Sequence, residues 1–200
     1  MSIALRCRCG QVRGEVAAAR SYARLVCHCR YCQAYARFLG RTDVVDAWGG
    51  TDIVAMPPSA VRLTAGADRL ACVCLSGKGP LRWYAACCRT PLANTAREAS
   101  LPYAGIVVAC LDAPSASIDA AFGAARAVLN VASATAPVRR TPLATALAGM
   151  RLLARLLAAR LRGDRVSPFF DEKTGLPVCA PERLDAGQRA ALLRETGGRE

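Results

Sequence analysis

The sequence predicts a mainly β domain over residues 1–135, followed by an α-helical extension over residues 136–200. Two observations support this division. Short runs that alternate polar and apolar residues recur between turns in the first part, as expected for half-buried strands. From Leu143 onward, apolar residues instead recur every three or four positions, which is the period of a helical face. With 200 residues, of which 53% are hydrophobic, the chain can bury a core.

Strands in the first part are predicted where residues alternate in polarity or stay apolar throughout. The predicted strands span residues 11–16, 52–56, 69–75 and 105–111. The first and third alternate with a period of two, and the second stops against two prolines. The fourth is a continuous apolar run, which suits a strand buried on both faces. A short helix is predicted over residues 31–39, and a glycine-rich turn at 76–80 leads directly to Arg82-Trp83-Tyr84.

A longer helix is predicted between Pro142, which suits a first turn, and Gly163, which favours a stop. One face carries the apolar residues Leu143, Leu147, Met150, Leu153, Leu157 and Leu161. Arg151, Arg155 and Arg162 fall on another face, which is either solvated or meets an acidic partner or an anionic membrane surface. The helix could also support an oligomer.

Arg151, Arg155 and Arg160 interrupt the apolar stretch of this helix, so the protein is not expected to be transmembrane. A short final helix is predicted from a capping box at Asp185 and Gln188, and residues 197–200 are expected to fray.

The formal net charge of +12 comes mostly from arginine, because Lys78 and Lys173 are the only lysines. Nucleic-acid binding would rest on this charge alone, since no pattern of interleaved aromatic and basic residues accompanies it. We therefore predict no specific nucleic-acid partner. No N-terminal apolar run follows a basic segment, so a secretory signal is not expected and the protein is predicted to be cytoplasmic.

The sequence holds 11 cysteines, and its clusters of closely spaced cysteines are the most informative feature of the chain. The clustered residues are Cys7, Cys9, Cys27, Cys29, Cys32, Cys87 and Cys88. Neighbouring thiols in a CxC pattern bridge to each other only with strain, and in a reducing cytoplasm such cysteines are typical metal ligands. Crowded thiols can surround a tetrahedral Zn²⁺ ion at Zn–S distances of about 2.3 Å. The sequence therefore predicts Zn²⁺ as the cofactor, with one or two ions per chain.

The order and spacing of the clusters over residues 3–112 resemble the glutathione-dependent formaldehyde-activating (GFA) enzymes, which include the centromere protein V group. The family pattern is CxCG, then CHCxxC, then an aromatic residue followed by CxxC-Gly-Thr-x-Leu. The corresponding segments here are 7–10, 27–32 and 83–92. The resemblance implies a small zinc-binding β-tent of two bent antiparallel sheets, in a divergent branch with a C-terminal extension.

The last cluster departs from the family pattern. Aligned on Thr90-Pro91-Leu92, the first cysteine of the family's CxxC falls on Ala85, while Cys87 stands next to Cys88. The resemblance implies a structural zinc ion held by the N-terminal pair and Cys88, joined by Cys87 only if the local turn rotates its sulfur inward. Otherwise the ion has three protein ligands or the site is empty. Arg89 replaces a family glycine whose position suggests a positive φ.

Cys27, Cys29 and Cys32 match the family's second motif, and the resemblance implies that they hold the zinc associated with activity, with an open fourth position. Three thiolates on Zn²⁺ leave a net charge of about −1, which suits binding a thiol or carbonyl better than generating hydroxide. The predicted activity is that of a carbon–sulfur lyase on thiol–aldehyde adducts of the S-hydroxymethylglutathione type, with a small glutathione-like thiol or an aldehyde as substrate. The alternative is a non-enzymatic, zinc-stabilised interaction module.

The sequence also suggests roles for several other residues, in some cases with two alternatives. His28, the only histidine, is expected to point away from the metal. Arg82 either binds a substrate carboxylate or lies on a solvated strand face, and Trp48 either borders a cleft or closes a small core. The remaining cysteines are Cys72, Cys74, Cys110 and Cys179. The first three are expected in the core, and the last in a loop without a role.

Overall fold

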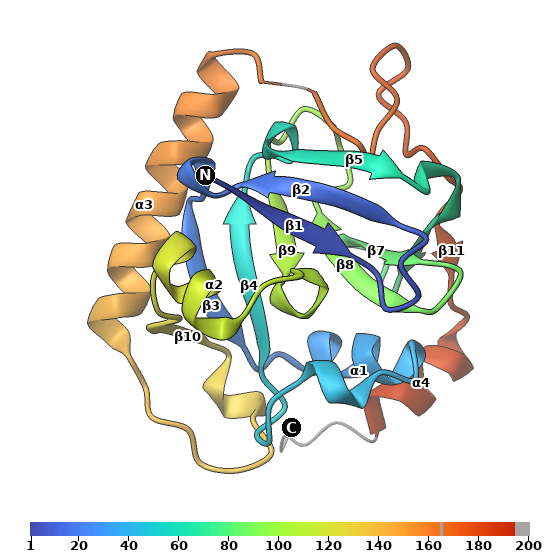
Figure 1. Cartoon of the computed structure of the whole chain (residues 1–200). Coiled ribbons are helices and arrows are strands. Elements are labelled where there is room, and N and C mark those ends of the chain that lie inside the picture. The colour runs from blue at the N-terminus through green and yellow to red at the C-terminus, as the bar shows by residue number, and fades with distance from the viewer. Residues whose placement is uncertain (165, 195–200) are drawn as a thin grey trace.

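The structure, a computed structural model, describes residues 1–164 and 166–194. It contains two β-sheets (Figure 1). The smaller sheet is antiparallel and consists of β1 (Ser2–Arg6), β2 (Arg13–Ala17) and β5 (Val61–Ala65). The larger sheet has the order β10 (Ala127–Leu129), β3 (Ala23–Cys27), β4 (Thr51–Met56), β9 (Ala104–Val107), β8 (Thr90–Thr95), β7 (Leu81–Ala85), β6 (Leu70–Cys74) and β11 (Glu182–Arg183).

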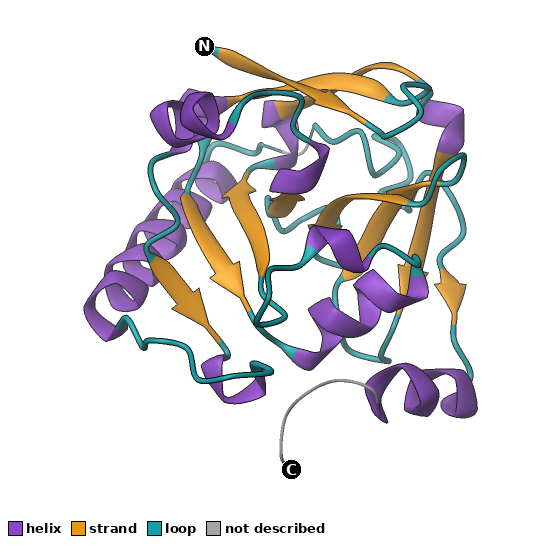
Figure 2. Cartoon of the chain, turned by 60° about the horizontal axis from the view of Figure 1, so that its bottom comes forward, coloured by secondary structure: helices purple, strands orange, loops and turns teal. Residues whose placement is uncertain are grey.

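Within residues 1–164 and 166–194, four α-helices lie around the sheets (Figures 1 and 2). They are α1 (Arg30–Phe38), α2 (Ser115–Phe122), α3 (Pro142–Leu161) and α4 (Ala186–Arg194). Helix α3 runs along the β10–β3 edge of the larger sheet, whereas α1 and α4 lie together at the opposite side from the small sheet (Figure 1). The prediction of a mainly β protein with a helical part is confirmed.

The outermost strands of the larger sheet differ from the predicted pair of antiparallel sheets. β10 pairs with β3 in parallel, and β11 pairs with β6 in parallel. A long segment of the chain separates each of these short strands from its partner strand. Parallel strands require such a crossover connection, because a tight hairpin joins only antiparallel strands. The two additions cover strand edges that would otherwise expose unpaired backbone groups.

The predicted elements are largely present, with one early ending. The strands expected at 11–16, 52–56 and 69–75 correspond to β2, β4 and β6. The run at 105–111 leaves the sheet after Val107, because Val108–Cys110 forms a turn of 3₁₀ helix that is closed by Leu111 N–H donating to Val108 O at 2.9 Å. The helices expected at 31–39 and after Pro142 are present as α1 and α3.

The capping box of the final helix is formed as expected. Gln188 N–H donates to the Asp185 carboxylate at 2.8 Å, and Asp185 N–H donates to the Gln188 side-chain carbonyl at 3.0 Å. This reciprocal pair satisfies two backbone donors that a helix start would leave unpaired. The fraying expected at residues 197–200 lies outside the described residues.

The main core fills the space between the two sheets. Leu5 and Val16 of the small sheet pack in the same cluster as Val54, Trp83 and Ile106 of the large one. Cys72 and Cys110 are buried there as predicted, and Cys74 is also buried.

The chain that follows α3 contributes to this core. The ring centroid of Phe169 lies 5.2 Å from that of Trp83, and the centroid of Phe170 lies 6.0 Å away. Trp83 is fully buried, and its indole N–H donates to the Thr95 hydroxyl at 2.8 Å. Residues 169–170 are thus part of the central packing rather than an external tail.

We expect Phe169→Leu to lower the free energy of unfolding by about 1–2 kcal/mol, because the substitution removes ring contacts with Trp83 and leaves a small cavity. Urea unfolding followed by tryptophan fluorescence measures the change. Leu176→Ala, at a side chain that is 63% exposed, is the matched control and should change the free energy by less than about 0.5 kcal/mol. A Phe169→Leu protein as stable as the wild type would contradict the packing described here.

Helix α3 presents one apolar face to the protein and another to the outside. Leu152, Leu156 and Ala159 pack with Tyr22 and Ala55. The apolar face that the sequence singled out, from Leu143 to Leu161, is instead exposed. By length and composition α3 would be long and apolar enough to cross a membrane, with 6% of its most apolar window buried, but one such helix is weak evidence for a span.

Candidate metal sites

The first cysteine cluster joins the two sheets. Cys7 and Cys9 lie in the turn between β1 and β2, while Cys87 and Cys88 lie in the turn between β7 and β8. The four sulfur atoms all lie within 4.8 Å of one another. Arg8 N–H donates to the Thr90 hydroxyl at 3.0 Å, so a hydrogen bond ties the two turns together directly beside the thiols.

The sulfur separations in this cluster suit a tetrahedral ion. Cys7 and Cys9 Sγ are 3.5 Å apart, and Cys9 and Cys87 Sγ are 3.2 Å apart. Cys87 Sγ lies 3.9 Å from both Cys7 Sγ and Cys88 Sγ. Four sulfurs at about 2.3 Å from a shared Zn²⁺ would be about 3.8 Å from one another. The donor set and its spacing therefore fit zinc.

The turn between β7 and β8 brings Cys87 into the cluster and leaves Ala85 outside it. Ala85 is the last residue of β7 and is fully buried, and its carbonyl accepts from Arg89 N–H at 2.8 Å. Arg89 has φ +55°, in the left-handed region that favours glycine. This conformation reverses the chain within the turn and leaves Cys87 facing the N-terminal pair.

Hydrogen bonds reach several thiols of the first cluster and act on them in opposite directions. Val12 N–H donates to Cys7 Sγ at 3.2 Å. Burial acts to raise the pKa of Cys88, but hydrogen bonds from Thr90 and Cys9 outweigh it and lower that pKa to about 6. Burial and hydrogen bonding to neighbouring sulfurs raise the pKa of Cys87, so this thiol would lose its proton only when a metal ion replaces it.

The second cluster lies where β3 meets α1. Cys27 is the last residue of β3, Cys29 caps the N-terminus of α1, and Cys32 lies in its first turn. Cys29 and Cys32 Sγ are 3.2 Å apart, and all three sulfurs lie within 4.8 Å of one another. Cys32 N–H donates to Cys29 Sγ at 3.3 Å, so the helix start turns its unpaired backbone donors toward the sulfur.

The three thiols of the second cluster differ in acidity. Hydrogen bonds from Cys27 and Cys32, assisted by the positive charge of Arg82, lower the pKa of Cys29 to about 2. The hydrogen bond to Cys29 raises the pKa of Cys27, and those to Cys27 and Cys29 raise the pKa of Cys32. The Asn130 side chain also donates to Cys27 Sγ at 3.3 Å. These shifts make Cys29 the most acidic thiol of the cluster.

Arg82 is a buried cation beside the second cluster. Its side chain is 4% exposed, and its Nη1 and Nη2 lie 3.8 and 3.9 Å from Cys32 Sγ. Nη1 donates to the Asn94 side chain at 3.1 Å, and the guanidinium lies 5.1 Å from the centroid of the Tyr35 ring. Within residues 1–164 and 166–194, no carboxylate forms an ion pair with Arg82. The sulfurs therefore provide its negative partner, and the alternative of a solvated strand face was wrong.

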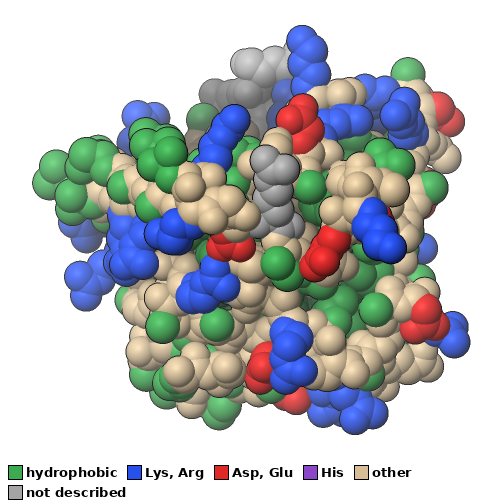
Figure 3. Space-filling view, turned by 90° about the horizontal axis from the view of Figure 1, so that it is seen from above, with side chains coloured by type: hydrophobic (Ala, Val, Ile, Leu, Met, Phe, Trp, Pro, Cys, Tyr) green, Lys and Arg blue, Asp and Glu red, His purple; other side chains and the backbone are tan. Residues whose placement is uncertain are grey.

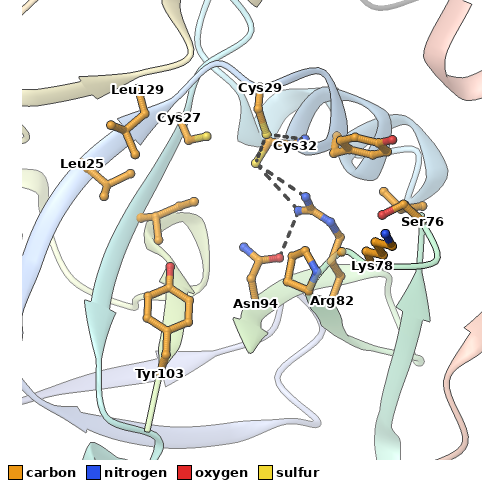
Figure 4. Close-up of a pocket in the computed structure, with 15 residues that line it drawn as sticks. Leu25, Cys27, Cys29, Cys32, Ser76, Lys78, Arg82, Asn94, Tyr103 and Leu129 are labelled. Carbon is orange, nitrogen blue, oxygen red and sulfur yellow. Dashed lines mark hydrogen bonds between the residues drawn. The ribbon is translucent and has the colours of Figure 1, made fainter. Parts of the chain in front are cut away.

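The second cluster opens into a cavity of about 430 Å³ (Figure 4). In the close-up, Leu25 and Leu129 lie on one side of the sulfurs, while Ser76 and Lys78 lie on the other. Arg82 and Asn94 form the wall beneath Cys32. A ligand in this cavity would meet the thiols between an apolar end and a polar, cationic end.

Other candidate residues lie away from the sulfurs. His28 is 2% exposed and faces Asp46, with Nε2 and Oδ2 3.6 Å apart, and it belongs to neither cysteine cluster. Trp48 is 48% exposed, so it closes no core. Cys179 belongs to neither cluster among the described residues. Asn94 and Asn130 were not predicted, because each reaches the site from a distant part of the chain and no local motif marks it.

Comparison with known proteins gives one family match over most of the chain. A family described as a family of unknown function (DUF6151) matches residues 1–179. No curated protein matches the sequence. A crystal structure of a Rhodobacter sphaeroides protein is similar at 20% identity, with a TM-score of 0.40, over 58% of this chain and 94% of that one.

Proposed function

The chain belongs to the DUF6151 family of unknown function, and we propose that it binds zinc at both cysteine clusters and uses the second to make or break thiol–aldehyde adducts. The observation that carries the proposal is the position of Cys27, Cys29 and Cys32 at the wall of a cavity, beside a buried arginine. The resemblance to the GFA enzymes in the three cysteine motifs supports the same reaction.

Zinc fits the donor sets better than a harder cation does. Both clusters consist of thiol sulfur, and thiolates favour zinc and other soft metals, whereas Mg²⁺ and Ca²⁺ take oxygen ligands. Four thiols complete a tetrahedron and suit a structural ion, while three leave a position for a substrate atom. All cysteines of the chain are free thiols, which suits the reducing cytoplasm that the sequence predicts.

Arg82 supplies the charge balance that the second site requires. A zinc ion with three thiolates carries a net charge of about −1, and a buried charge of this kind is stable only beside an opposite charge. The guanidinium lies against Cys32 and is fixed by Asn94 and Tyr35. With zinc bound by the three thiolates, the ion, its ligands and Arg82 would together be nearly neutral, at the wall of the cavity.

The cavity suits a small thiol with a polar or anionic body. Lys78 and Ser76 line its polar end and can receive a carboxylate, while Leu25, Ile53 and Leu129 enclose the opposite side. When bound, the zinc ion would supply a Lewis acid that orients the thiol or the carbonyl. In the forward direction, the thiol sulfur bonds to the aldehyde carbon and the thiol proton ends on the carbonyl oxygen. The reverse reaction breaks the same carbon–sulfur bond and returns the proton to sulfur.

Activity of the zinc-loaded protein tests this proposal. We expect the wild type to accelerate formation of the adduct between formaldehyde and glutathione, followed by NMR, and Cys29→Ser to lose that acceleration because the second site lacks a ligand. Native mass spectrometry should show two zinc ions in the wild type and one in the variant. Cys179→Ser, which alters a thiol outside both clusters, is the matched control and should behave as the wild type.

An unchanged adduct rate with several thiols and aldehydes, in protein that holds two zinc ions, would overturn the enzymatic proposal. The outward apolar face of α3 would then favour the second candidate, a non-enzymatic module in which zinc stabilises a surface for other molecules.

A further inference from the structure

The outer face of α3 carries more exposed apolar surface than a solvated helix needs. Its large side chains are Leu143 (79% exposed), Leu147 (62%), Met150 (61%), Leu153 (65%), Leu157 (53%) and Leu161 (80%). We call these six residues the outer leucine face. Single exposed leucines are common, but a contiguous row of this length indicates a surface that meets another apolar phase.

The outer leucine face is not needed to attach α3 to the protein. The helix is held by its opposite side, where Leu152, Leu156 and Ala159 pack with Tyr22 and Ala55. Thr145, on the inner side, donates to Val128 O at 3.2 Å and so fixes the start of the helix against β10. The helix is therefore held in place while its outer leucine face is free to bind.

Arginines border the outer leucine face on both sides. At about 3.6 residues per turn, Arg151, Arg155 and Arg162 fall on one flank and Arg160 on the other. Arg139 and Arg140 precede the helix, and residues 139–162 contain no acidic side chain. Seen from above, green hydrophobic side chains gather at the left edge, where α3 lies in Figure 1, with blue cationic side chains beside them (Figure 3).

A groove of about 570 Å³ continues this surface at the start of the helix. It is lined by Trp48, Val128, Pro137 and Ala144, with Arg126 and Arg139 at its sides. Tryptophan favours the boundary between a lipid headgroup layer and the acyl chains, because its ring is apolar and its N–H is polar. Trp48 is half exposed next to the helix and could anchor there.

We propose that the outer leucine face binds the surface of an anionic membrane, with α3 lying in the plane of the interface. The apolar side chains would enter the boundary of the acyl chains, and the flanking arginines would reach the lipid phosphates. Charge distinguishes this partner from a second copy of the chain. Self-association through the same face would bring two arginine borders together on chains of net charge +12, whereas anionic lipids complement them.

Vesicle flotation of the full chain tests the proposal. We expect flotation with vesicles of equal parts phosphatidylcholine and phosphatidylglycerol at low salt, weaker flotation at high salt, and little with phosphatidylcholine alone. The double variant Leu147→Gln/Leu157→Gln should bind at least about tenfold more weakly, because both side chains would be polar at the interface. Leu176→Gln, an equally exposed leucine outside α3, should bind as the wild type.

Two results would overturn the proposal. One is equal flotation of the wild type and the double variant. The other is no flotation of the wild type together with a dimer in analytical ultracentrifugation that the double variant abolishes, which would assign the outer leucine face to a second copy. Because these substitutions lie away from the cysteines, zinc content verifies that the variants fold, and a failure here leaves the proposed reaction unaffected.

Discussion

Replacing Arg82 by methionine is expected to weaken zinc binding at the second cluster by about 10–100-fold. Arg82 is buried against Cys32, and the described residues place no carboxylate beside it. Methionine has a similar length and fills the space, but it leaves the negative charge of a zinc ion with three thiolates without a partner. At the upper end, the loss corresponds to about 2.7 kcal/mol.

The effect of Arg82→Met should depend on the metal. In the zinc-loaded protein, the substitution removes the opposite charge of the site and should lower the free energy of unfolding. In the metal-free protein, the thiols can take up protons when the arginine is gone, so that no charge is left buried. A variant that loses the same stability with and without zinc would show that Arg82 acts through packing alone.

Competition with a chromophoric zinc chelator measures the affinity. The measurement is best made in a Cys87→Ser background, in which the first cluster is expected to bind no zinc, so that the measured affinity is that of the second cluster. Arg97→Met is the matched control, because Arg97 Nη1 also lies close to a thiol, 3.3 Å from Cys74 Sγ, but Cys74 belongs to neither cluster. Arg82→Lys keeps the charge and should recover part of the affinity. Equal affinities for the wild type and Arg82→Met would contradict the charge balance proposed here.

The cysteine clusters could be predicted from the sequence because their information is local. Cys27, Cys29 and Cys32 are brought together by one strand end and one helix start within six residues, and the helix was expected near its observed place. Arg82 and Asn130 could not be connected with them in this way. Asn130 contacts Cys27 across 103 residues, and that contact depends on the parallel pairing of β10 with β3, which no sequence pattern marks.

Several strands could also not be predicted from local sequence patterns. Periodicity revealed β2, β4 and β6, but β1, β3, β5 and β8 were not predicted, and β10 and β11 span only three and two residues. Short strands at an edge owe their place to the neighbouring strand rather than to their own residues. In α3 the predicted face exists, but its outward direction could not be foreseen, because Leu152 and Leu156 make the inner side apolar as well.

Cys87→Ser is expected to remove the zinc ion of the first cluster and to lower the free energy of unfolding by about 4 kcal/mol when zinc is present at a thousand times its dissociation constant. Cys87 Sγ lies 3.2 Å from Cys9 Sγ and 3.9 Å from Cys7 Sγ, so its thiol faces both sulfurs of the N-terminal pair. A serine hydroxyl is a weaker zinc ligand than a thiolate. The loss would also release the joint between the small and large sheets, because each sheet supplies two thiols.

Native mass spectrometry should show two zinc ions in the wild type and one in Cys87→Ser, and urea unfolding in excess zinc gives the change in free energy. Cys179→Ser, with its thiol outside both clusters, should retain two ions. Retention of both ions by Cys87→Ser would mean that Cys7, Cys9 and Cys88 suffice as ligands. Loss of one ion in Cys87→Ser would show that Cys87 is a required ligand of the first cluster.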